Sequence, residues 1–267
     1  VDIGMGCLSG MFERNDDVLY ICYDNGAYMN TGVQRSGATP PAARTATTQP
    51  VGENPGNVFG QGKDVPRIAM AHEVPYVATA TVADLRDLEY KVRKAMQFRG
   101  SRYIHVLVPC PLGWGSASNL TIRLARLATQ CGLFPVYEAE NGEITSVTKL
   151  RRPVPVTEYM RPQRRFAHVF KKGQEDVLER MQQIADRNIR RYGLIDPEQL
   201  DEDVLERILA AGEDPEGRFT QRIIEEASKA KRTQSDAFSA DDHPLSGATS
   251  ASAMRHLAGN SAAKGEK

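Results

Sequence analysis

The sequence feature that most constrains the fold is an apolar run that ends in polar residues and a glycine. Residues 18–23 contain no charged side chain and are followed at once by Asp24, Asn25 and Gly26. A short continuous apolar run is typical of a buried strand in a parallel sheet. Open α/β sheets bind ligands at the carboxyl ends of their strands, and Mg²⁺ takes oxygen ligands that it shares with phosphate groups. The pattern predicts a metal–diphosphate site after residue 23, although Asp-Asn-Gly alone is often only a turn.

Strands and helices alternate through the first 150 residues. Strands separated by helices favour an α/β fold, with a mostly parallel sheet and helices on both faces. We therefore predict that residues 1–150 belong to one domain. The periodicity predicts helices over 2–13, 67–72, 81–98 and 116–131, and strands over 18–23, 74–80, 103–108, 135–139 and 144–150, the last two joined by a hairpin turn at Asn141-Gly142.

A long irregular segment follows the first predicted strand. Residues 31–65 are rich in Gly, Pro, Thr and Gln and have little periodicity. A loop of this length inside a domain is uncommon and is usually functional. Two interpretations of Arg35, Ser36 and Thr39 stay open here: they reach a phosphate-bearing ligand, or they only solvate the loop.

The chain changes character after residue 150. Residues 151–165 are basic and rich in proline, which predicts an extended arm lying on a neighbouring subunit. Polar helices are predicted over 175–192 and 196–211, so that 151–230 forms an arm with a helical extension. Residues 231–267 carry Ser, Ala, Gly and charge without periodicity, which predicts a disordered tail.

Charge and hydropathy exclude two classes of partner. The chain has 34 Lys and Arg and 34 Asp and Glu, so no net field attracts nucleic acid or an anionic membrane. No stretch approaches the roughly 18 apolar residues of a membrane helix, and the first residues lack the basic and apolar segments of a signal peptide. We predict a cytoplasmic protein that binds neither nucleic acid nor membrane.

The cysteines divide into two kinds. None of the four has CxxC spacing, which argues against a self-contained zinc or cluster site. Cys7, Cys22 and Cys131 fall in predicted helices and a strand and are interpreted as buried small hydrophobic residues. Cys110 is different because Pro111 favours an extended backbone before it and presents the thiol at a strand end. A packed free thiol is the simpler interpretation of the same residue.

Three segments together resemble a known family. They are Asp2-Ile3-Gly4, residues 23–32 (YDNGAYMNTG) and residues 109–115 (PCPLGWG). In this order, and over roughly residues 1–170, they are similar to the thiamine diphosphate-binding β subunit of pyruvate:ferredoxin oxidoreductases and related 2-oxoacid oxidoreductases. A Gly-Asp-Gly element that precedes Asp2 in that family is absent, so the chain is expected to be an N-terminally truncated part of a longer subunit.

The resemblance implies roles for individual residues. The Asn25 side chain and the Ala27 backbone carbonyl would be Mg²⁺ ligands. Asn30 would be catalytic, donating hydrogen bonds as charge develops on the 2-oxoacid carbonyl. Cys110 would be the last ligand of a [4Fe–4S] cluster whose other ligands lie outside this chain. The loop expected to bind thiamine diphosphate consists of Asn25, Gly26, Ala27, Tyr28, Met29 and Asn30.

The implied reaction is CoA-dependent oxidative decarboxylation of a 2-oxoacid to acyl-CoA and CO₂, with electrons passing to the cluster. The implied partners are a pyrimidine-domain subunit, CoA-related and ferredoxin-like subunits, coenzyme A, and ferredoxin or an NAD-linked acceptor. Residues 41–44 (Pro-Ala-Ala-Arg) differ from the family's usual Gly-Ala-Trp, which puts an aryl acid such as phenylglyoxylate beside pyruvate as substrate. A non-oxidative thiamine diphosphate decarboxylase and a non-catalytic assembly subunit are the alternatives.

Other conspicuous residues have ordinary interpretations. His105 lies inside a predicted strand and is expected to be a hydrogen-bonded core or interface histidine. Trp114, the only tryptophan, is expected to pack against the sheet edge. The arginine pairs at 151–152 and 164–165 are interpreted as subunit contacts, because no aromatic residues alternate with them as in a nucleic-acid surface.

Overall fold

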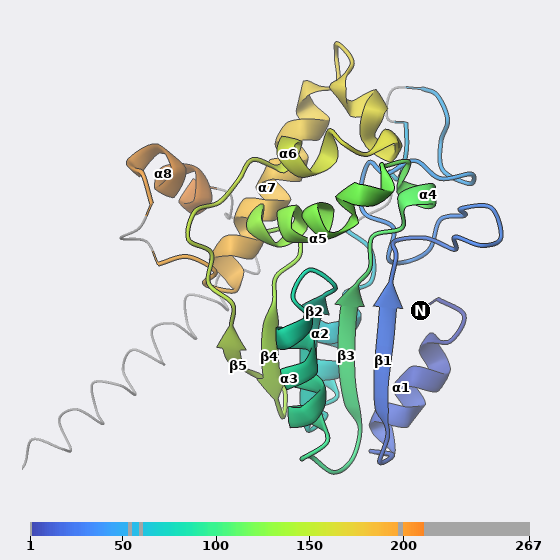
Figure 1. Ribbon diagram of the computed structural model, residues 1–267, viewed down its shortest axis with the longest axis vertical. Coiled ribbons are helices and arrows are strands. Elements are labelled where there is room, and N and C mark those ends of the chain that lie inside the picture. The colour runs from blue at the N-terminus through green and yellow to red at the C-terminus, as the bar shows by residue number, and fades with distance from the viewer. Residues whose placement is uncertain (1, 53–54, 59–60, 197–199, 211–267) are drawn as a thin grey trace, which may run out of the picture. The chain divides into compact units, whose positions relative to one another are not determined.

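A five-stranded mixed sheet lies at the centre of the computed structural model, in the order β1-β3-β2-β4-β5 (Figure 1). β3 pairs in parallel with both β1 and β2, whereas β4 is antiparallel to β2 and to β5. The α/β prediction is confirmed, but the sheet that was predicted to be mostly parallel is mixed, with two parallel and two antiparallel strand pairs. The strands are β1 (Leu19–Asp24), β2 (Tyr76–Thr81), β3 (Arg102–Leu107), β4 (Tyr137–Glu140) and β5 (Glu143–Val147).

The hairpin turn between β4 and β5 was correctly placed by its sequence. Asn141 has φ of 50° and Gly142 has φ of 84°. Two successive positive φ values are what a tight hairpin turn requires, and Asn-Gly adopts them at low cost.

Helices cover both faces of the sheet and its carboxyl edge (Figure 1). α1 and α2 pack with Tyr103 of β3 on one face, and α3 packs with Ile104 and Val106 on the other. α5, α6, η2 and α7 form a third core above the ends of β1 and β3. The helices are α1 (Met5–Glu13), α2 (Val65–Ala71), α3 (Leu85–Ala95), α4 (Pro111–Trp114), η1 (Ser118–Leu120), α5 (Thr121–Gln130), α6 (Val156–Met160), η2 (Arg164–Phe170), α7 (Glu175–Arg191) and α8 (Glu202–Ala210).

The structure describes residues 2–52, 55–58, 61–196 and 200–210. The predicted disordered tail over 231–267 lies outside them, and the predicted domain boundaries stay predictions. Within this described part of the chain, no helix combines the length and apolar character needed to cross a bilayer.

β1 differs from the prediction of a buried strand. It is parallel as expected, but it stands at the edge of the sheet in the described chain, and its side chains are only partly covered. Tyr20 is 43% exposed and Tyr23 is 69% exposed. The apolar run identified the strand correctly, while its burial depends on neighbours that the run itself does not specify.

The prediction of an extended arm over 151–165 is wrong. α6 and the start of η2 occupy this segment, and both pack on the same chain. Tyr159, Met160 and Phe166 are buried in the core formed with α5 and α7. The segment is therefore part of the fold.

Candidate functional site

The loops that follow β1 and β3 meet at the carboxyl edge of the sheet. Asp24 and Leu107 are partners in the parallel register, so the two strands end side by side. The Trp114 Nε1–H then donates a hydrogen bond of 2.7 Å to the backbone carbonyl of Asn25. A Cβ atom on Gly113 would overlap the sulfur of Met29. The fold thus brings together two segments, 24–31 and 109–115, that are far apart in the sequence.

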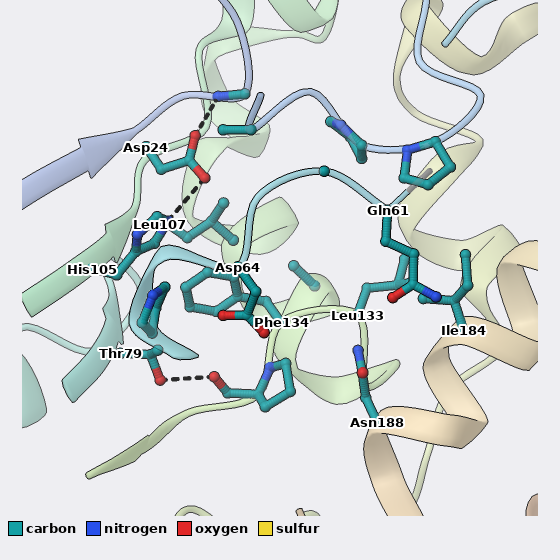
Figure 2. Close-up of a pocket in the computed structure, with 18 of the residues that line it drawn as sticks. Asp24, Gln61, Asp64, Thr79, His105, Leu107, Leu133, Phe134, Ile184 and Asn188 are labelled. Atoms are coloured by element: carbon teal, nitrogen blue, oxygen red, sulfur yellow. Dashed lines mark hydrogen bonds and ion pairs between the residues drawn. The ribbon is translucent and has the colours of Figure 1, made fainter. Parts of the chain in front are cut away.

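A buried hydrogen-bond chain supports the first of these loops from below. The Gly26 amide donates to Asp24 Oδ1 at 2.8 Å, and His105 Nε2 lies 3.0 Å from Asp24 Oδ2 (Figure 2). The other ring nitrogen, Nδ1, lies 2.8 Å from the Tyr103 hydroxyl. Because Asp24 accepts on both oxygens, Nε2 donates and Nδ1 accepts from the tyrosine. The prediction of a hydrogen-bonded core histidine at 105 is confirmed.

The long loop after residue 31 fixes the same turn from above. Thr39 is fully buried, and its hydroxyl donates to the Gly26 carbonyl at 2.7 Å. The Asn57 side chain donates to the Thr39 carbonyl at 2.8 Å. Gly26 has φ of 79°, a conformation that glycine adopts without the steric cost of a Cβ. The Thr39 hydroxyl therefore bonds within the protein. The Ser36 hydroxyl does the same, since it accepts a hydrogen bond from the Ala38 amide at 3.2 Å.

The oxygens predicted to bind Mg²⁺ are the side-chain amide oxygen of Asn25 and the backbone carbonyl of Ala27. The backbone carbonyl of Asn25 already accepts a hydrogen bond from Trp114, so the side-chain amide oxygen is the atom that Asn25 could offer to a metal. Within the described ranges, no group donates a hydrogen bond to that oxygen or to the Ala27 carbonyl. These two neutral oxygens would hold Mg²⁺ only together with phosphate and water ligands. The same ranges hold no group of three or more His, Cys, Asp or Glu that could bind a metal without them.

Cys110, the predicted cluster ligand, precedes α4 just after the end of β3. Its backbone is extended, with φ of −102° and ψ of 105°, as Pro111 predicts. Its side chain is half-buried, and a Cβ on Gly113 would lie 3.6 Å from its sulfur. No other cysteine of the described residues joins it in a metal-binding group. It could therefore supply one ligand of a cluster, as the resemblance implies.

The remaining cysteines only partly match their prediction. Cys131 is fully buried, and burial raises the pKa of its thiol to about 12, which makes it unreactive at neutral pH. Cys22 is half-buried in β1. Cys7 is exposed, so its predicted burial is wrong. The buried side of α1 is formed by Leu8 and Phe12.

A cavity of about 360 Å³ opens beside the loops at the ends of β1, β2 and β3. Figure 2 shows Asp24, Thr79 and His105 on the strand side and Ile184 and Asn188 of α7 on the opposite side. Its size lies within the range of small-molecule sites, about 300–1,000 Å³.

Comparisons with known proteins relate the chain to a family. A family model for the C-terminal TPP-binding domain of thiamine pyrophosphate enzymes matches residues 1–106. Pyruvate synthase subunit PorB of Methanosarcina barkeri is 49% identical over 195 residues, which cover 73% of this chain and 66% of the relative. PorB of Methanocaldococcus jannaschii is 44% identical over 193 residues, 72% of this chain and 63% of the relative. Ketoisovalerate oxidoreductase subunit VorB of Pyrococcus abyssi is 43% identical over 178 residues, 66% of this chain and 56% of the relative.

The chain belongs to this PorB/VorB family. The resemblance predicted from its three motifs is thereby confirmed, while the roles of the individual site residues stay predictions. The chain spans between 56% and 66% of the length of these three relatives.

The sequence alone did not predict what η2 and α7 contribute to the candidate site. Arg165 was interpreted as a subunit contact, but it is buried with its guanidinium 3.8 Å from the centre of the Trp114 ring. Asn188 and Arg191 of α7 line the cavity more than 160 positions after Asp24. One signal was available: Val156, Tyr159 and Met160 have the i, i+3, i+4 spacing of a buried helix face.

Proposed function

We propose that this chain is the thiamine diphosphate-binding subunit of a 2-oxoacid oxidoreductase that carries out CoA-dependent oxidative decarboxylation. The observation that carries the proposal is the contact between the 24–31 loop and the Cys110 loop. Trp114 bonds to the Asn25 carbonyl, and Met29 packs on Gly113. A metal–diphosphate loop and a cluster ligand would thus be neighbours, which is what electron transfer from the cofactor to a cluster requires.

Residues of the 24–31 loop would hold the cofactor and orient the substrate. When bound, thiamine diphosphate supplies the electron sink for decarboxylation. Asn25, through its side chain, and Ala27, through its carbonyl, would hold Mg²⁺ against the diphosphate. Asn30 is exposed at the end of the loop, where its amide is available to donate to the 2-oxoacid carbonyl. Cys110 would supply one thiolate to a [4Fe–4S] cluster.

Partner subunits would close the site. Leu112 of the Cys110 loop is 90% exposed, and Tyr23 beside the metal loop is 69% exposed. Large apolar side chains exposed at a site are typical of a surface that a partner covers. The relatives are named as subunits, which supports a hetero-oligomer containing the pyrimidine-domain, CoA-related and ferredoxin-like subunits implied by the motifs.

Pyruvate is the first substrate to test. The relatives named above are a pyruvate synthase subunit and a ketoisovalerate oxidoreductase subunit. The unusual 41–44 segment is the reason to include phenylglyoxylate in the panel. Pro41 lines the cavity, while Ala42 and Ala43 are buried in the core that contains Trp114.

The test uses the intact complex. Bound thiamine diphosphate and Mg²⁺ are quantified, and pyruvate, 2-ketoisovalerate and phenylglyoxylate are assayed for CoA-dependent CO₂ release with a ferredoxin-type acceptor. Asn25→Ala is expected to lower cofactor occupancy at least tenfold, and Asn119→Ala, an exposed asparagine outside the loop, to leave it unchanged. A wild-type complex without cofactor would support an assembly subunit. Decarboxylation without acceptor reduction would support a non-oxidative enzyme. Either outcome rejects the proposal.

A further inference from the structure

Arg165 is a buried cation without a carboxylate partner. Its side chain is only 6% exposed. Nε donates to the Gln163 side-chain oxygen at 2.8 Å and Nη2 donates to the Tyr159 hydroxyl at 3.0 Å. None of the described carboxylates comes within the 4.0 Å of an ion pair. Arginine is almost never buried in proteins unless it is paired, so an unneutralised guanidinium here calls for an explanation.

Aromatic packing fixes the orientation of this guanidinium. It lies 3.8 Å from the centre of the Trp114 ring and 4.9 Å from that of Phe166. Such stacking offsets part of the cost of burying the charge. It also orders the group before any ligand arrives, which reduces the entropy lost on binding.

The remaining nitrogen of Arg165 is directed at the metal loop. Nη1 would lie 3.0 Å from a Cβ on Gly26, and Arg165 lines the same cavity as Asp24 and His105. No donor bond from Nη1 is found within the described residues. A charged donor is therefore presented to the cavity beside the turn that carries Asn25.

The cavity as a whole is positively charged. Four cations line it, Lys63, Arg67, Arg165 and Arg191, against two carboxylates. Both carboxylates already accept hydrogen bonds: Asp24 from the Gly26 amide and His105, and Asp64 from the Arg67 amide at 3.2 Å. Lys63 also pairs with Asp2.

We propose that Arg165 is an anion-binding residue of this cavity and that its ligand is a phosphate group. The excess of positive charge among the lining residues favours an anionic ligand. Guanidinium groups bind phosphate oxygens through charge-assisted hydrogen bonds. Thiamine diphosphate and coenzyme A both contain such phosphate groups. Naming them as candidate ligands rests on the proposed function.

Trp114 provides a direct test in the full chain, because it is the only tryptophan and stacks on Arg165. Inorganic pyrophosphate is titrated in EDTA, so that no metal contributes, while tryptophan fluorescence is recorded. We expect a saturable change in the wild type and at least tenfold weaker binding in Arg165→Gln. Arg165→Lys should recover part of the loss. Arg164→Gln removes the same charge from an exposed neighbour and should bind within twofold of the wild type.

A second measurement covers the case in which Arg165→Gln does not fold. Wild-type chain is treated with phenylglyoxal, and modification of Arg165 is followed by mass spectrometry with and without pyrophosphate. Protection of Arg165 supports the proposal. Equal modification in both samples, or equal pyrophosphate affinity of folded Arg165→Gln and wild type, overturns it.

Competition experiments identify the source of the phosphate and separate this proposal from the proposed function. Displacement of pyrophosphate by thiamine diphosphate, but not by thiamine, assigns the cofactor, and displacement by coenzyme A assigns the acyl acceptor. If pyrophosphate binds but neither thiamine diphosphate nor coenzyme A displaces it, the result supports the anion site and counts against the proposed function. If the complex decarboxylates a 2-oxoacid but the full chain binds no pyrophosphate, the anion site is overturned and the proposed function is retained.

Discussion

His105→Phe is predicted to destabilise the chain and to weaken cofactor binding at once. The substitution keeps a ring of similar size but removes both polar contacts of His105. The fully buried Tyr103 hydroxyl is then left with only the weakly hydrogen-bonding Cys22 thiol, and one oxygen of Asp24 loses its partner. An unsatisfied buried group costs about 1–3 kcal/mol, and water from the cavity can reach Asp24, so we expect a loss of about 2–4 kcal/mol. Urea unfolding at constant pH measures it.

The binding effect follows from the turn that Asp24 holds. An Asp24 side chain released from His105 should hold the Gly26 amide less firmly, which loosens the turn between Asn25 and Ala27. We therefore expect the affinity for thiamine diphosphate with Mg²⁺ to fall at least fivefold in the intact complex. A double-mutant cycle with Asp24→Asn should give a coupling energy of about 0.5–3 kcal/mol, because the two side chains are in contact.

His72→Phe is the matched control. His72 makes one hydrogen bond, at 3.0 Å to the Ser9 hydroxyl, and packs on Phe12 away from the loops. Loss of this hydrogen bond should lower the free energy of unfolding by about 1 kcal/mol and leave cofactor affinity unchanged. Equal destabilisation by both substitutions, or a destabilised His105→Phe that binds the cofactor normally, would refute the reasoning.

Three further predictions follow from single contacts. Gly113→Ala should displace Met29 and destabilise the chain by about 1–3 kcal/mol, and the double variant with Met29→Ala should recover most of that loss in urea unfolding; no recovery would mean that the two loops do not touch there. Burial alone would raise the pKa of Asp2, but hydrogen bonds from Lys63, the Gly37 amide and the Tyr28 hydroxyl lower it to about 2. The stabilisation from Asp2 should therefore be present above its ordinary pKa of 3.8 and be lost as the pH falls toward 2, a pH dependence that acid titration should find missing in Asp2→Asn. Cys110→Ser in the intact complex should abolish one iron–sulfur EPR signal while bound thiamine diphosphate is retained; an unchanged spectrum would remove the cysteine from the cluster.

Local sequence was sufficient for most helices and strands. Apolar runs bounded by glycine and proline placed β2 and β3, and Asn141-Gly142 placed the hairpin, because these signals act within a few residues. The edge position of β1 could not be predicted in the same way. A strand with exposed tyrosines and a fully buried strand can have the same composition, and only the tertiary neighbours distinguish them.

The sequence predicted the candidate site residues that lie in two short motifs. It did not predict those whose position depends on tertiary packing. Asn25 and Cys110 stand out by their immediate neighbours. Arg165 does not, since its burial arises from Trp114, Tyr159 and Gln163, which the fold assembles around it. Composition was misleading here: proline and arginine suggested an arm, while the helical spacing of the apolar residues after 155 indicated a packed helix.

The contacts that build the loops also determine when they can form. Asn25 and Trp114 are 89 positions apart, and Asp24 and His105 are 81 apart. Closing such long segments is entropically costly, and the pairing of β1 with β3 closes segments of similar length, so we expect these contacts to form together with that pairing. A nascent or partly unfolded chain therefore has no cofactor pocket to offer, and whatever ligand the pocket retains stabilises only the finished structure. Ligand occupancy should for this reason report damage to the native state earlier than secondary structure does.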